Sequence, residues 1–187
     1  MPLSRFVSLA GVCLIVLVLV SCSSDSPTKP DDGTIEVDLS KFPNTGQQVP
    51  NRTVMADQWA SLGILFDALP EWVDPIVEYF GGEQAHIFFA PDTAGAVAVF
   101  SFVEVGSRTP TDISAFEIEP WFSPGESAEL IGLDEGGAEV AMDTVTADDI
   151  GDVSTGILMS IEGTFRTVEW RTHGNPGIAA GYIAFEF

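Results

Sequence analysis

The sequence predicts an all-β fold, an antiparallel β-sandwich of about 8 to 10 strands with one or two short helices. From Thr34 onward, short apolar runs are separated by clusters of Gly, Pro, Asp and Asn at intervals typical of such sandwiches. In the first run, Ile35, Val37 and Leu39 alternate with acidic residues, which places the aliphatic side chains on one face of a strand. The sequence has no long internal repeat, and this disfavours propellers and solenoids.

Residues 1–21 have the profile of an export signal. Arg5 is the only early charge, and an apolar run from Phe6 to Val20 ends at the polar Ser21. The apolar region of an export signal has about 7 to 15 residues, whereas a membrane-spanning helix needs about 20. The run therefore predicts a signal peptide.

The end of this segment indicates a lipid anchor. Residues 19–22, Leu-Val-Ser-Cys, resemble the lipobox of bacterial lipoproteins, which implies that the Cys22 thiol is acylated and that Cys22 becomes the new N-terminus. Residues 22–33 then form a lipidated flexible tether, because nothing after Cys22 in this stretch is apolar and larger than proline. Ser23 stands where an Asp retains such proteins at the inner membrane, so the resemblance favours the outer membrane if the host is Gram-negative. The alternatives are an ordinary signal peptide and an uncleaved short anchor.

Residues 34–187 form the predicted sandwich domain. Both cysteines, Cys13 and Cys22, precede it, so the domain has neither a disulfide nor a cysteine-based metal site. Segments 54–62 and 72–80 could form short helices, the second with Pro75 in its first turn. Segment 133–138 predicts a tight hairpin, because Gly136 and Gly137 can adopt the positive φ of such turns. Strands are expected at 64–68, 86–90, 96–105, 113–122, 128–134, 139–146, 156–162, 165–171 and 178–187.

Several sequence segments resemble motifs of secreted bacterial β-sandwich domains. Residues 57–66, Asp-Gln-Trp-Ala-Ser-Leu-Gly-Ile-Leu-Phe, resemble a phrase that follows the first strand in such domains, and 45–49, 130–140 and 167–170 agree with the same pattern. Together they resemble jelly-roll domains of the kind that includes galactose-binding-like and carbohydrate-binding modules, over most of 34–187. The last strand lacks the acidic residue that this family often carries there, and this departure weakens the transfer of a calcium or ligand site to it.

The charge of the chain argues against nucleic acid as a partner. The sequence has 28 acidic residues and only 7 Lys plus Arg, for a net charge of −21. Non-specific affinity for nucleic acid depends on basic side chains that contact phosphates, and no basic patch is visible. The acidity fits a solubilising surface, adaptation to high salt or calcium loading.

The residues available for chemistry predict a protein that is not an enzyme. The sequence has no Gly-x-Ser-x-Gly motif and only two histidines, which we expect at a strand edge (His86) and in a loop (His173). Two separated histidines are too few for a zinc site. A carboxylate pair of the glycoside hydrolase type cannot be singled out among 28 acids, so this reaction class stays open as a weaker alternative.

One acidic segment is a candidate calcium site. Asp148, Asp149 and Asp152 crowd one loop region near Asp143 and Gly151, and calcium binds several converging oxygen ligands. The spacing is not that of an EF-hand. The alternative is a solvated acidic loop.

Aromatic side chains near prolines and glycines are candidate ligand-binding residues. Trp72, Tyr79 and Trp121 lie in expected loops or strand ends, where aromatic rings could stack on sugars, whereas Trp59 and Trp170 lie in apolar patterns typical of a core. Packing is the alternative for the first three as well. We therefore expect a membrane-anchored, extracytoplasmic module that binds a glycan or another envelope component with the loops opposite the tether. The alternative is an assembly lipoprotein with a protein partner.

Overall fold

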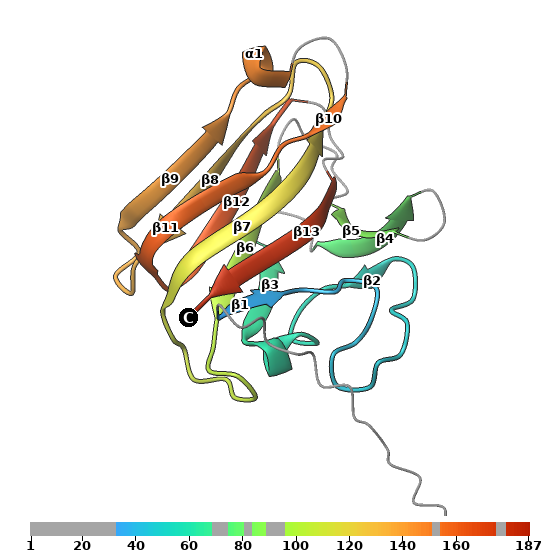
Figure 1. Cartoon of the computed structure of the whole chain (residues 1–187), viewed down its shortest axis with the longest axis vertical. Helices are drawn as coiled ribbons and strands as arrows, with labels where there is room; N and C mark the ends of the chain where they lie inside the picture. Colours follow the sequence, from blue (N-terminus) through green and yellow to red (C-terminus); the bar gives the residue numbers. More distant parts are fainter. Residues whose placement is uncertain (1–32, 69–74, 81–83, 89–95, 151–153, 175–178) are drawn as a thin grey trace, which may run out of the picture.

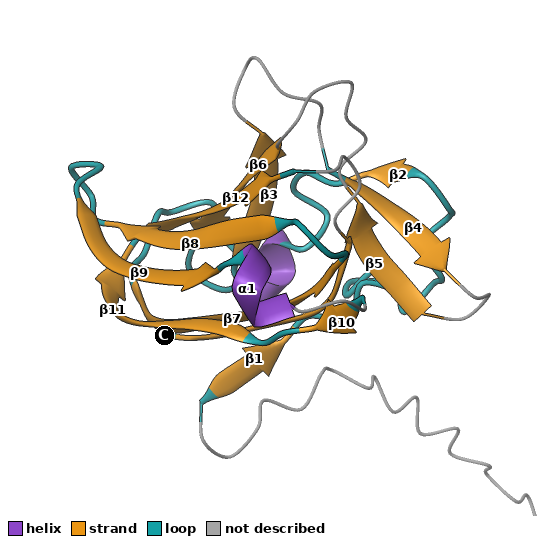
Figure 2. Cartoon of the chain, turned by 90° about the horizontal axis from the view of Figure 1, so that it is seen from above, coloured by secondary structure: helices purple, strands orange, loops and turns teal. Residues whose placement is uncertain are grey.

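The computed structural model describes residues 33–68, 75–80, 84–88, 96–150, 154–174 and 179–187. The predicted signal peptide and the predicted tether up to residue 32, including Cys22, lie outside these residues, as does Trp72. Two antiparallel sheets face each other across one core, which confirms the predicted jelly-roll β-sandwich (Figure 2). Within the described part of the chain, no helix is both long enough and apolar enough to cross a membrane.

The larger sheet supplies the front of the molecule in Figure 1. Its strands are ordered β10-β7-β13-β5-β4-β2, with β1 paired to β13 and β11 paired to β7. Every strand pair in it is antiparallel. The strands are β1 (Thr34–Glu36), β2 (Thr53–Val54), β4 (Ile76–Phe80), β5 (Gln84–Phe88), β7 (Ile113–Phe122), β10 (Thr155–Gly156), β11 (Met159–Phe165) and β13 (Ala179–Glu186).

The smaller sheet lies behind the larger one and is also antiparallel. Its order is β3-β6-β12-β8-β9. Two short helical turns connect strands, the 3-10 turn η1 (Ala60–Leu62) and the helix α1 (Ala147–Ile150). The strands are β3 (Ile64–Ala68), β6 (Ala96–Phe102), β8 (Ser127–Leu133), β9 (Glu139–Val145) and β12 (Thr167–His173).

The core between the sheets consists of alternate side chains from both, many of them aromatic. Trp59 and Trp170 are fully buried there, which confirms their predicted place. The Trp59 ring packs edge-on against Phe66 with centroids 5.4 Å apart, and Phe66 contacts Phe100 in the same way at 5.7 Å. Phe100 then contacts Phe116 of the opposite sheet at 5.0 Å, so one run of rings connects the two layers. Such aromatic pairs add about 0.5 to 1.5 kcal/mol each beyond the burial of their area.

The predicted hairpin is present between β8 and β9, which pair as neighbours. Asp134 organises its turn, because one carboxylate oxygen accepts hydrogen bonds from the backbone N–H groups of Gly136 and Ala138, both at 2.8 Å. Gly137 has a φ of 79°, as predicted. Gly136 does not have a positive φ, so that part of the prediction is wrong.

The helix predictions need correction. Only Ala60–Leu62 of segment 54–62 is helical, as a 3-10 turn, and Val54 belongs to β2. In segment 72–80, residues 76–80 form β4 instead of a helix. Val77 lies opposite Ile87 of β5 and Tyr79 lies opposite Ala85, so these residues pair and alternate as strand residues do. The prediction also missed α1, which has four residues.

Candidate functional site

Trp121 is the most exposed tryptophan of the described residues, and it lies on the outer face of the larger sheet. Along β7, Phe116, Ile118, Pro120 and Phe122 are buried, while Glu117, Glu119 and Trp121 alternate with them and point outward. The Trp121 side chain is 52% exposed, whereas Trp59 and Trp170 are completely buried. Packing in the core therefore does not explain why position 121 is aromatic.

The two strands beside β7 leave the Trp121 ring uncovered. Gly156 of β10 and Ala179 of β13 lie directly opposite Trp121, one on each side. Directly opposed residues of antiparallel strands share a face of the sheet, and these two carry no side chain or only a methyl group. The indole therefore stands between two small residues and offers a flat apolar surface to solvent.

Glu119 lies beside this ring on the same face. A Cβ atom built at Gly156 would be 2.8 Å from the Glu119 Oε1 atom, so the carboxylate lies over the glycine. Any side chain at position 156 would displace the carboxylate from this place. The missing side chain of Gly156 thus both exposes Trp121 and gives room to a hydrogen-bond acceptor next to it.

Tyr182 and Glu117 continue the same face along β13 and β7. Tyr182 lies opposite Glu119 in the strand register, and its hydroxyl donates a hydrogen bond of 3.4 Å to the Glu117 Oε2 atom. Both side chains are half-buried. We call the surface formed by Trp121, Glu119, Glu117, Tyr182, Gly156 and Ala179 the Trp121 face.

The Trp121 face could have been found from the alternation of segment 113–122. Its inward residues are apolar and its outward residues include Glu117 and Glu119, so the same alternation places Trp121 outward with these two acids. The nearby prolines and glycines mark Trp121 only as a strand-end residue, whereas the alternation also shows which face of the strand it occupies. Gly156 could not be found in this way, because its pairing with β7 depends on the folded topology.

Tyr79, another predicted ligand-binding residue, has a structural role that accounts for it. It lies on β4, and its hydroxyl donates a hydrogen bond of 2.8 Å to the backbone oxygen of Val49. The Ser40 oxygen is a longer second acceptor at 3.4 Å. These contacts fasten the loop between β1 and β2 to the edge of the larger sheet.

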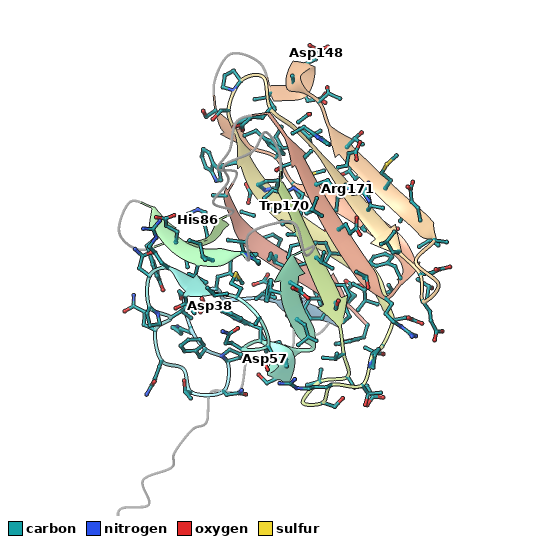
Figure 3. All side chains as sticks on the ribbon, turned by 180° about the vertical axis from the view of Figure 1, so that it is seen from behind. Asp38, Asp57, His86, Asp148, Trp170 and Arg171 are labelled. Carbon is teal, nitrogen blue, oxygen red and sulfur yellow. The ribbon has the colours of Figure 1, made fainter. Side chains whose placement is uncertain are left out.

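The predicted calcium site is described only in part. Asp149 accepts hydrogen bonds from the Thr146 hydroxyl at 2.7 Å and from the Thr146 N–H at 2.8 Å, as in a helix-capping pair at the start of α1. The hydrogen bond from the Thr146 hydroxyl lowers the pKa of Asp149 below its ordinary value, and the bond from the Thr146 N–H lowers it further by a smaller amount. Asp148 is exposed at the end of the molecule (Figure 3), and Asp152 lies outside the described residues. Among the described residues, no three metal-binding side chains gather, and calcium stays a prediction.

The two histidines lie in different sheets. His86 is buried on β5, and His173 is exposed at the end of β12 with its Nε2 atom 3.9 Å from a Glu129 oxygen. They therefore do not form one site together.

A shallow hollow of about 340 Å³ lies at the end of the molecule opposite α1, and no sequence motif predicted it. The Ser61 hydroxyl oxygen is buried there without a hydrogen-bond partner in the described structure. Arg108 is ion-paired with Asp57, which Figure 3 places far from Asp148. The residues that line this hollow are Asn44, Ala60, Ser61, Gly106, Ser107 and Arg108.

Comparisons with known proteins concern the fold alone. The sequence matches no protein-family model and no curated protein. An arabinose-bound α-L-arabinofuranosidase is similar in structure with a TM-score of 0.50 and 11% identity over 82% of this chain, which spans only 26% of that enzyme. A family 29 carbohydrate-binding module gives a TM-score of 0.43 at 11% identity, covering 81% of this chain and 90% of the module. A family 6 module from Clostridium stercorarium in complex with cellobiose gives 0.36 at 8% identity, covering 65% and 92%.

Proposed function

We propose that this protein is a lipid-anchored, extracytoplasmic glycan-binding module without catalytic activity, and that the Trp121 face is its binding surface. The observation that carries the proposal is the exposed Trp121 ring between Gly156 and Ala179, with the Glu119 carboxylate beside it. The proposal agrees with the sugar ligands named for the similar structures, but it depends on this geometry and not on the likeness.

The chemistry of the Trp121 face matches the two sides of a sugar. One side of a pyranose ring presents C–H groups, which pack on the flat apolar face of an indole. The hydroxyl groups at the rim need acceptors, and carboxylates are strong ones. Glu119 stands next to the ring, and Glu117 is held in place by Tyr182. A preorganised surface of this kind binds with little loss of side-chain freedom.

The strand register supports an anchor at the opposite end of the domain. Thr34, where β1 begins, lies opposite Glu186, whereas Trp121 lies opposite Ala179 at the start of β13. At about 3.3 Å per residue, these two positions are about 23 Å apart along β13. A lipid on Cys22 followed by a tether to Thr34 would therefore attach at the end of the domain that lies far from Trp121.

Glycan binding can be tested with Trp121→Ala. Full-length protein in detergent is applied to a glycan array, and the affinity for the bound oligosaccharides is then measured by calorimetry. We expect Trp121→Ala to weaken binding at least about tenfold, which corresponds to about 1.4 kcal/mol. The oligosaccharide should be recovered uncut.

Met142→Ala is the matched control, because Met142 is 55% exposed and lies on β9 of the other sheet. This variant should bind as the unaltered protein does. Unchanged affinity in Trp121→Ala, or equal losses in both variants, would contradict the proposal.

A further inference from the structure

The Trp121 face belongs to a surface that carries only negative charge. The strands β1, β7, β10, β11 and β13 contain no lysine or arginine. The strand register puts five carboxylates on the outer face of these strands: Glu36, Glu117, Glu119, Glu162 and Glu186. An uncompensated surface of one sign raises the local concentration of groups with the opposite charge.

The lysines and arginines of the described residues lie outside the strands of this surface, and most of them form ion pairs with other carboxylates. No ion pair within the described part of the chain includes Glu117 or Glu119. Four of the five cationic side chains form ion pairs away from the Trp121 face: Lys41 with Asp38, Arg108 with Asp57, Arg166 with Asp112 and Glu135, and Arg171 with Glu169. The Trp121 face therefore has an aromatic ring and carboxylates but no positive partner of its own.

We infer that the Trp121 face prefers an amino sugar, whose ammonium group is bound by Glu119 while the sugar ring stacks on Trp121. A hydrogen bond between an ammonium and a carboxylate is stronger than one between neutral groups. The indole face also attracts a cation directly. A sugar with a carboxylate would instead be repelled by Glu119 and Glu117. This inference rests on the proposed glycan-binding function and specifies the ligand of the same surface.

Glu119 is the residue that determines this preference. It is exposed and lies next to the ring, over Gly156, whereas Glu117 accepts the Tyr182 hydroxyl. Because the Glu119 carboxylate lies where a Cβ atom at position 156 would stand, Gly156→Ala should move the carboxylate aside and weaken the same preference.

The test compares two oligosaccharides of the same length and linkage that differ only at the nitrogen, which is a charged amine in one and a neutral acetamide in the other. An oligomer of β-1,4-linked glucosamine and its fully N-acetylated counterpart of equal length are titrated into the full-length protein in detergent. The pH is chosen so that the amine is protonated. We expect the glucosamine oligomer to bind about fivefold or more tightly than the acetylated one.

Two variants separate a local effect from the general acidity of the protein. Glu119→Gln should remove the preference while leaving the affinity for the acetylated oligomer within about twofold. Glu162→Gln makes the same change in charge on the same face, but Glu162 lies opposite Ala115, about 20 Å along β7 from Trp121. The preference should therefore persist in this control.

Each outcome leads to a different conclusion. Equal affinity for the two oligomers, or a preference that survives Glu119→Gln, overturns the inference. If Trp121→Ala then still weakens binding of the acetylated oligomer, the proposed glycan-binding function stands without it. An oligolysine that binds more tightly than either sugar, and depends on Trp121 and Glu119, would show that the surface recognises a basic protein segment instead. If neither oligomer nor any other glycan binds, the proposed function itself is wrong.

Discussion

Gly63 shows how much a single position without a side chain contributes to this fold. It follows η1 and has a φ of 97°, a conformation that disfavours other residues. A Cβ atom there would be 2.5 Å from the Phe187 ring and 2.9 Å from the backbone oxygen of Val103. Gly63 therefore closes the turn into β3 and lets the last side chain of the chain pack over it.

Gly63→Ala should lower the free energy of unfolding by about 3 kcal/mol, because backbone strain and a steric clash act together. Gly46→Ala is the control. Gly46 also has a positive φ, 65°, but a Cβ atom there would meet nothing within 4 Å, so the expected cost is only about 1 kcal/mol. Chemical denaturation of both variants measures the difference. Equal losses would show that the contacts with Phe187 and Val103 do not matter.

The elements of the sandwich could be predicted to different extents. The bounds of β3 and β7 were predicted correctly, because apolar alternation and flanking turn residues mark both ends. The strand β4 was missed, because Ile76, Val77 and Phe80 fit helical spacing as well as a short strand. Only pairing with β5 decides between them. β2 has two residues, too few for any periodic pattern.

The short helix α1 gives a prediction about pH. Hydrogen bonds from Thr146 lower the pKa of Asp149 in the folded protein below its ordinary value of 3.8. The stabilisation that Asp149 provides is thus complete above this value and is lost as the pH falls through the lower pKa of the folded state. Asp149→Asn should be less stable than the unaltered protein at neutral pH, and the difference should shrink in acid. Thermal melting at a series of pH values checks this, and a difference that grows in acid would contradict it.

The same element provides the test for calcium. If calcium binds at Asp148, Asp149 and Asp152, adding it should raise the melting temperature and a chelator should reverse the increase, because a ligand of the folded state stabilises it. Asp148→Asn should then reduce the increase without disturbing the cap of α1, which uses Asp149. A melting temperature that responds to neither calcium nor chelator would mean that these carboxylates are simply solvated.

At the scale of the whole molecule, the fold class could be predicted from the sequence, but the proposed binding surface only in part. Alternating patterns determine which side chains enter the core, and so Trp59 and Trp170 were placed correctly. The Trp121 face combines β7, β10 and β13, which are distant in sequence. Only the strand register shows that Gly156 and Ala179 lie opposite Trp121 and leave its ring exposed. The uncompensated charge around Trp121 likewise appears only when the strands are assembled.

The proposed anchor gives a prediction for the whole chain. Cys22→Ser should abolish labelling by a radioactive fatty acid and release the protein from the membrane fraction, because a serine hydroxyl cannot form the thioether to the lipid. Ser23→Ala is a suitable control and should remain labelled. A Cys22→Ser protein that stays in the membrane fraction would show that another segment holds it there.

A crystal structure of the full-length protein with a bound oligosaccharide tests the central claim most directly. The account predicts a sugar ring stacked on Trp121, with a hydrogen bond to the Glu119 carboxylate. A sugar bound instead to the sheet formed by β3, β6, β12, β8 and β9, with Trp121 still exposed to solvent, would contradict it.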